Sequence, residues 1–124
     1  MAVETRGIRH VHLLVRDLPC SGAFYEAAFG MMVAFRDGKI LFLRSPGGGD
    51  YLALHQASTP EERARVGQPG GFEHFGITVT DRSRIDEAIA AVLAAGGALV
   101  EKGDHASGVP FAYVSDPDGY LIEI

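Results

Sequence analysis

The feature that most constrains the fold of this chain is an internal repeat. The segment Arg9–Asp17 (RHVHLLVRD) can be laid over Glu73–Asp81 (EHFGITVTD) at a constant offset of 64 residues, so that His10 falls on His74. In both halves a helical pattern follows, and then three short β-rich runs separated by turn residues. A repeat of this kind predicts two copies of one supersecondary unit.

The predicted elements follow the same order in each half, as a strand, a helix and three strands (a βαβββ module). Helices are expected over Pro19–Phe29, which ends at Gly30, and from Ser83 to the Gly96-Gly97 pair, where Asp86 completes a near capping box. The β-rich runs that follow the helices predict strands over Met32–Arg36, Ile40–Arg44, Tyr51–Gln56, Ala98–Glu101, Phe111–Ser115 and Tyr120–Ile124.

The 124 residues fit a single domain of the α+β class. Module 1 is expected at about 7–56 and module 2 at about 72–124, joined by the polar, Pro- and Gly-rich linker 57–71. Two four-stranded sheets, each with a helix outside, can curve into an open, barrel-like mixed sheet around a cleft. Alternate strand residues would then line that cleft.

The cleft face of the first strand carries two imidazoles. His10, His12 and Leu14 share one face of this strand, and the intervening apolar residues share the other. If the apolar face packs under the helix, both histidines point into the cleft, and by the repeat so does His74. Glu123 stands among apolar residues of the last strand (YLIEI), where burial of a carboxylate is costly unless a cation compensates its charge.

Two histidines and one glutamate from separate strands form a metal-ligand set. Such sets bind zinc with an open fourth position, or non-haem iron(II) as a facial triad with several open positions. The alternative is that each histidine is a hydrogen-bonded core residue and that Glu123 faces solvent. The repeat-equivalent positions of His10 and His74 favour the metal site.

Charge and composition exclude several partners. The net charge is −5, and no basic stripe is present, which argues against nucleic acid and anionic membranes. No apolar run approaches the roughly 20 residues that span a bilayer, and the N-terminus lacks the apolar stretch of a signal peptide, so a cytoplasmic location is expected. The single cysteine, Cys20, excludes an internal disulfide and is expected to be structural, although its place before a helix would also suit a thiolate.

The chain resembles the vicinal oxygen chelate superfamily, which includes glyoxalase I, extradiol dioxygenases, fosfomycin resistance enzymes and bleomycin-binding proteins. The matching stretches are IRHVHLLVRDLPCSGAFYEAAFG, EHFGITVTD and FAYVSDPDGYLIEI. The resemblance implies a divalent ion held by His10, His74 and Glu123, with Fe²⁺ or Mn²⁺ favoured and Zn²⁺ or Ni²⁺ as alternatives. It also implies a homodimer that exchanges modules, so that His10 of one subunit meets His74 and Glu123 of the other.

The resemblance leaves the reaction subclass open. The fourth ligand of glyoxalase I would fall on Ala53, which argues against that enzyme unless His55 substitutes. Extradiol dioxygenases use three ligands and a tyrosine at the place of Tyr113, but their catalytic histidine would fall near Asp50, unless His12 or His55 stands in. Fosfomycin enzymes share that tyrosine and usually carry a threonine where His12 stands.

The favoured function is a dioxygenase-like oxidoreductase that acts on a small substrate with adjacent oxygens, such as a catechol. The catalytic candidates are Tyr113 and His12, although His12 would equally serve as an outer hydrogen-bond partner, a substrate contact or a cleft-lining residue. A glyoxalase I-like lyase or isomerase or a fosfomycin-type thiol transferase is the alternative, and a non-catalytic bleomycin-type drug-binding protein is a third. His55 and His105 are expected to be non-ligands, and the candidate aromatic residues of the cleft are Phe42, Tyr51, Phe111 and Tyr113.

Overall fold

The order of elements in the computed structural model, which describes residues 1–124, is the one that the repeat predicts. The first half contains β1 (His10–Val15), α1 (Leu18–Phe29), β2 (Met32–Asp37), β3 (Ile40–Arg44) and β4 (Tyr51–Gln56). The linker contains α2 (Pro60–Arg65). The second half contains β5 (Phe75–Gly76), the 3-10 turn η1 (Arg82–Arg84), α3 (Ile85–Ala94), β6 (Ala98–Asp104), β7 (Pro110–Ser115) and β8 (Leu121–Glu123).

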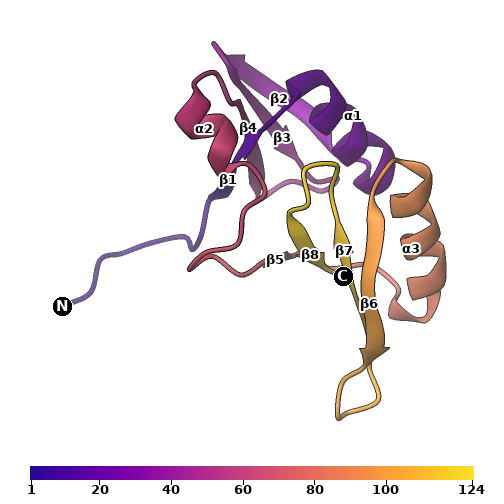
Figure 1. The fold of residues 1–124 in the computed structure, drawn as a ribbon. Coiled ribbons are helices and arrows are strands. Elements are labelled where there is room, and N and C mark those ends of the chain that lie inside the picture. Colours follow the sequence, from indigo (N-terminus) through magenta and orange to yellow (C-terminus); the bar gives the residue numbers. More distant parts are fainter.

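The strands form two separate four-stranded mixed sheets (Figure 1). The strand order is β1-β4-β3-β2 in one sheet and β5-β8-β7-β6 in the other. In each sheet the module's first strand runs parallel to its last, and the remaining pairs are antiparallel. The identical order confirms the two βαβββ modules, and within one chain the sheets do not close on each other.

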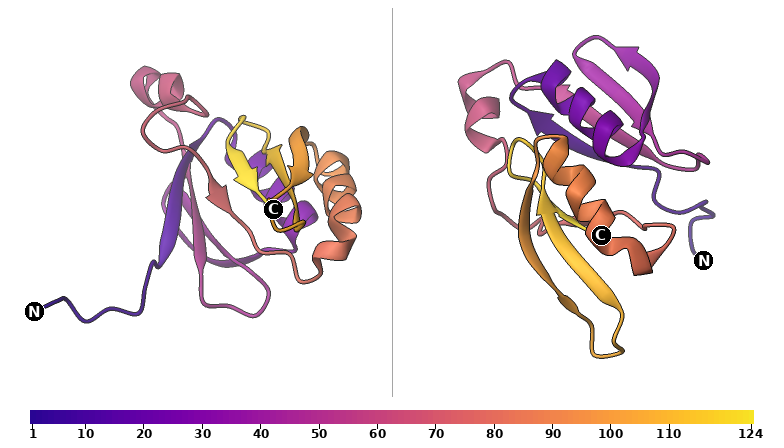
Figure 2. Two further views of the ribbon diagram at one scale, coloured as in Figure 1. Left: turned by 90° about the horizontal axis from the view of Figure 1, so that it is seen from below. Right: turned by 90° about the vertical axis from the view of Figure 1, so that its right-hand side faces the viewer.

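One continuous hydrophobic core lies beneath the two helices. In Figures 1 and 2, α1 and α3 lie together on one side of the molecule, and the N-terminal segment projects from the opposite side. Leu13 and Val15 of β1 are buried in this core, whereas His10 is half-buried and His12 is exposed on the opposite strand face. This confirms the predicted alternation along β1. None of the helices has the length and apolar character that a membrane span requires.

The C-terminal end of α1 lies at the glycine that the sequence indicates, and its N-terminal end is capped by Asp17, which the prediction does not name. The Asp17 side chain accepts a hydrogen bond from the Cys20 N–H at 3.0 Å, and the helix ends at Gly30 with φ of 66°, a conformation that glycine adopts without strain. Cys20 itself carries a free, exposed thiol. These local signals need no tertiary context, so the prediction of α1 is accurate to one residue.

Module 2 departs from the prediction in its helix cap, in its first strand and in β6, which runs to Asp104 rather than to Glu101. The expected capping box of Ser83 and Asp86 is wrong, because Asp81 caps the 3-10 turn and accepts from both the N–H of Ser83 (3.0 Å) and its hydroxyl (2.6 Å). The first strand is also shorter than its counterpart β1, since ladder pairing is limited to Phe75 and Gly76. The two repeats are therefore more alike in sequence than in strand pairing, because β1 pairs over six residues and β5 over two.

The linker contains one short helix with a complete capping box. Thr59 Oγ1 accepts from the N–H of Glu62 at 3.1 Å, and Glu62 Oε1 accepts from the N–H of Thr59 at 3.1 Å and of Ser58 at 3.2 Å. Val66, which follows the helix, is 1% exposed and anchors its end. The capping box therefore fixes the Glu62 carboxylate in place.

Replacing Thr59 with alanine is expected to lower the free energy of unfolding by about 1 kcal/mol, because the first turn of α2 loses its side-chain acceptor. Urea denaturation measures this loss. Replacing Thr5, which lies in the exposed N-terminal segment, is the control. Equal midpoints for the two variants would show that the capping box contributes nothing.

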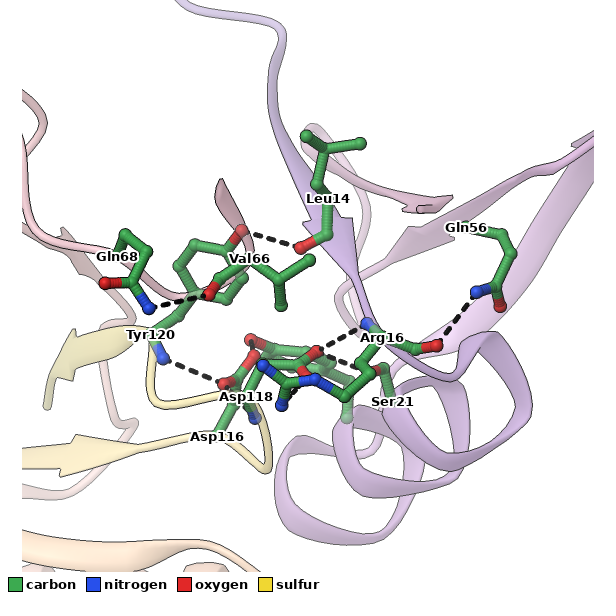
Figure 3. A network of polar contacts seen from close by, with 10 residues as sticks. Leu14, Arg16, Ser21, Gln56, Val66, Gln68, Asp116, Asp118 and Tyr120 are labelled. Atoms are coloured by element: carbon green, nitrogen blue, oxygen red, sulfur yellow. Dashed lines mark hydrogen bonds and ion pairs between the residues drawn. The ribbon is translucent and has the colours of Figure 1, made fainter. Parts of the chain in front are cut away.

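A polar cluster, here called the inter-module clamp, joins the β7–β8 turn to module 1 (Figure 3). Asp118 accepts from the Arg16 N–H at 3.2 Å and from the Ser21 hydroxyl at 3.3 Å. The buried Asp116 accepts from the Tyr25 hydroxyl at 2.7 Å. Burial raises the pKa of Asp116, and the hydrogen bond from Tyr25 opposes that rise. The clamp thus couples the position of the last two strands to α1.

Candidate functional site

Two of the three predicted ligands lie side by side on the sheet of module 2. His74 immediately precedes β5, and Gly76 pairs with Glu123 of β8. As a result, His74 Nε2 lies 3.6 Å from Glu123 Oε2. Both side chains are partly buried, with 26% of the His74 side chain and 30% of the Glu123 side chain exposed. This separation is close to that of two ligands that each lie about 2.1 Å from one ion.

The surroundings of the other ring nitrogen of His74, Nδ1, are compatible with metal binding at Nε2. His74 Nδ1 is buried and has no hydrogen-bond partner. The carboxylate oxygen Oε1 of Glu73 lies 3.9 Å from this nitrogen, which is too long for a hydrogen bond. If Nε2 takes an ion, Nδ1 carries the proton, and a carboxylate on that side is the usual partner of a metal-bound imidazole.

Tyr113 and His105 complete the surroundings of Glu123. Tyr113 pairs with Glu123 across β7 and β8, and its ring lies 5.0 Å from that of His74, edge to face. Desolvation, and then the charge of Glu123, raise the pKa of Tyr113, so its hydroxyl stays protonated at neutral pH. His105 Nε2 lies 3.8 Å from Glu123 Oε1. The sequence places His105 in a Gly-rich loop, whereas β6 extends to Asp104 and brings it to the carboxylate.

The third predicted ligand, His10, lies on the sheet of module 1. Its Nδ1 accepts a hydrogen bond from Arg9 Nε at 3.2 Å. Within one chain, no group of three His, Cys, Asp or Glu side chains is arranged to hold a metal ion. The structure therefore brings His74 and Glu123 together and leaves His10 on the other sheet, and the complete triad stays a prediction.

A second polar cluster lies on the exposed face of module 1. His12 Nε2 lies 3.3 Å from His55 Nδ1, and His55 Nε2 lies 3.9 Å from Glu62 Oε2. Desolvation, and then the neighbouring His55 and His10, lower the pKa of His12. These side chains line a cavity of about 1160 Å³, together with His10, residues of the linker and residues of module 2 such as Val100 and Tyr120. Glu62 is absent from the predicted site, although its capping box is legible in the sequence TPEE.

An aromatic cluster borders the same face of module 1. The rings of Phe35 and Phe42 stack at 4.3 Å, and Tyr51 meets both of them edge-on. Tyr51 pairs with His10 across β1 and β4, which places the two side chains on one face. The sequence predicts Phe42 and Tyr51 for the cleft but not Phe35, which is 48% exposed.

Two positions that bear on the reaction subclass have structural roles. Ala53, which pairs with His12, is fully buried and has no ligand atom. Asp50 closes the β3–β4 loop, because its carboxylate accepts from the N–H of Ser45 at 2.9 Å and from its hydroxyl at 2.8 Å. Neither position therefore supplies a fourth ligand or a catalytic histidine.

Comparison with protein families and known structures gives consistent matches. Residues 7–124 match the Glyoxalase/Bleomycin resistance protein/Dioxygenase superfamily. The virulence protein STM3117 of Salmonella typhimurium is 31% identical over 123 residues, which cover 94% of this chain and 81% of that protein.

Two solved structures show the extent of the similarity in fold. A glyoxalase-related enzyme from Fulvimarina pelagi is 27% identical, with a TM-score of 0.77 over 97% of this chain and 87% of that one. The fosfomycin resistance protein FosX of Listeria monocytogenes has the same TM-score of 0.77 at 20% identity, over 97% of this chain and 92% of that one. At this identity the likeness to FosX concerns the fold alone.

Proposed function

Because the chain belongs to the Glyoxalase/Bleomycin resistance protein/Dioxygenase superfamily, we propose that it is a divalent-metal-dependent enzyme acting on a small substrate with adjacent oxygens. His10, His74 and Glu123 hold the ion in this proposal. The observation that supports it best is the His74–Glu123 pair at 3.6 Å, backed by the unpartnered Nδ1 of His74. Fe²⁺ or Mn²⁺ suits two imidazoles and one carboxylate with open positions.

The proposed site is assembled from two copies of the chain, with His10 of one protomer facing His74 and Glu123 of its partner. No three such ligands meet within one chain. Both outer strands, β2 and β6, expose large apolar side chains that a second copy can cover. These exposed side chains are Met32, Val33, Phe35, Leu99 and Val100.

The chain's own residues suggest how the substrate is held. When bound, a divalent ion acts as a Lewis acid toward adjacent substrate oxygens. The Tyr113 hydroxyl, which lies on the strand paired with Glu123, donates a hydrogen bond to one of those oxygens. His12 lies on the same strand face as His10 and supplies a second polar contact to the substrate.

The aromatic cluster favours a ring-bearing substrate and hence dioxygenase-like chemistry. Phe35, Phe42 and Tyr51 offer flat apolar surface on the face that carries His10. An aromatic ring gains stacking energy against such surface while its two oxygens face the polar side chains. A catechol combines both features, and the absence of a ligand atom at Ala53 separates this site from a four-ligand isomerase.

Anaerobic reconstitution with Fe²⁺ or Mn²⁺ tests the proposed function. We expect about one ion per chain and, after air is admitted, uptake of one O₂ for each catechol consumed. Removal of the ion with a chelator should abolish the uptake. Isomerisation of a hemithioacetal with Ni²⁺ or Zn²⁺, without oxygen uptake, would instead support a glyoxalase-like enzyme. Tight binding of an aromatic ligand that chelators leave unchanged would support a binding protein.

A further inference from the structure

We propose that Glu62 and His55 are positioning residues that hold His12 in one tautomer, with Nε2 protonated and Nδ1 left as a hydrogen-bond acceptor for a substrate hydroxyl. The tautomer assignment stands on contacts within one chain. Only the hydrogen bond from a substrate hydroxyl to His12 Nδ1 rests on the proposed function.

The series of contacts begins at the Glu62 carboxylate, whose orientation is fixed by backbone hydrogen bonds. Glu62 Oε1 is held by the N–H groups of Ser58 and Thr59 at 3.2 and 3.1 Å. The same two hydrogen bonds help to lower the pKa of Glu62, so the group is ionised at neutral pH. With Oε1 engaged by the backbone, Oε2 is the oxygen that faces His55, at 3.9 Å from Nε2.

The negative charge of Glu62 orients His55. A carboxylate attracts a ring N–H and repels a ring lone pair, so the proton of neutral His55 is favoured on Nε2. The separation of 3.9 Å allows this attraction, or one bridging water, but no direct hydrogen bond. With the proton on Nε2, the Nδ1 of His55 is an acceptor.

The orientation of His55 then fixes His12. His55 Nδ1 lies 3.3 Å from His12 Nε2, and only one of the two nitrogens can carry the shared proton. Because His55 Nδ1 is the acceptor, His12 Nε2 is the donor, and His12 Nδ1 keeps its lone pair. The two rings meet edge to face, with an interplanar angle of 63°.

The role of the acceptor follows from its place beside the proposed metal ligand. His12 stands two residues from His10 on the same strand face, and both line the large cavity that module 1 shares with the linker and module 2. A neutral imidazole with a fixed lone pair accepts a hydrogen bond from an O–H of the substrate. A substrate class with at least one free hydroxyl, such as a catechol, is therefore favoured over one that carries only carbonyl oxygens.

Long-range ¹H–¹⁵N NMR of the metal-free protein, recorded about two pH units above the ordinary histidine pKa, tests the tautomers directly. We expect His12 and His55 both to be protonated at Nε2. In Glu62→Gln, whose amide oxygen can still accept in the capping box, both rings should show an increased Nδ1–H population. Glu61→Gln makes the same charge change on an exposed neighbour in α2 and should leave both rings unchanged.

A double-mutant comparison distinguishes positioning from a structural role. Glu62→Gln should lower kcat for catechol by about tenfold or more, whereas in a His55→Phe background it should have no further effect. An Nδ1–H tautomer of His55 in the unmodified protein, or identical spectra of that protein and Glu62→Gln, would overturn the proposal. The spectra need no metal. If they show the expected tautomers of His55 and His12 but the protein does not turn over catechol, the result would count against the proposed function and not against the tautomer assignment.

Discussion

Replacing His74 with alanine is expected to reduce the bound Fe²⁺ or Mn²⁺ from about one ion per chain to a trace amount. The imidazole supplies Nε2, the nitrogen nearest the Glu123 carboxylate at 3.6 Å. Without it, at most one neutral imidazole and one carboxylate remain, which is too small a ligand set to retain the ion through dialysis. Elemental analysis after dialysis measures the loss.

The matched carboxylate variant tests the other half of the pair. Glu123→Gln keeps the shape of the side chain but removes the charge that compensates a divalent ion, so it should lose the metal as His74→Ala does. Glu26→Gln, which changes an exposed carboxylate on α1, should retain it. Unchanged metal stoichiometry in both site variants would exclude the triad.

Replacing Tyr25 with phenylalanine is expected to lower the free energy of unfolding by about 1.5–3 kcal/mol at neutral pH. The Tyr25 hydroxyl donates at 2.7 Å to the buried Asp116, and its removal leaves that carboxylate with one donor fewer. Urea denaturation followed by circular dichroism measures the loss. Tyr51→Phe is the control, because the Tyr51 hydroxyl makes no hydrogen bond in the structure.

The stability loss in Tyr25→Phe should depend on pH. Burial raises the folded-state pKa of Asp116 above its unfolded value, so ionised Asp116 reduces stability as the pH rises between those two values. Loss of the Tyr25 hydrogen bond raises the folded pKa further. The deficit of the variant should therefore be largest at neutral pH and shrink as the pH falls toward the ordinary aspartate range. A deficit that does not change with pH would show that Asp116 is not the affected group.

The sequence repeat predicts the fold well because its signals are local. Proline at the start of α1 and glycine at its end define that helix, and alternation along β1 separates His10 and His12 from Leu13 and Val15. The weak point is β5, where the repeat predicts a full strand and the ladder contains only two residues. Ladder length depends on how β5 pairs with β8, and although the sequence predicts the β8 strand, no local pattern reveals how far the two strands pair.

The contacts around the site depend on tertiary placement that the sequence does not express. His12 pairs with Ala53 in the strand register, so its contact with His55 is diagonal across β1 and β4. Glu62 reaches His55 only because α2 folds back beside β1. The hydrogen bond from Tyr25 to Asp116 joins residues that lie 91 positions apart in the sequence.

Metal binding by mixed dimers tests the central claim most directly. His10→Ala and His74→Ala chains, carrying different tags and expressed together, form mixed dimers in which one shared site has lost both ligands and the other is intact. Each variant alone should bind almost no metal, and the purified mixed dimer should recover about half of the wild-type stoichiometry. Mixed dimers that remain free of metal would contradict a site built from His10 of one protomer and the His74–Glu123 pair of its partner.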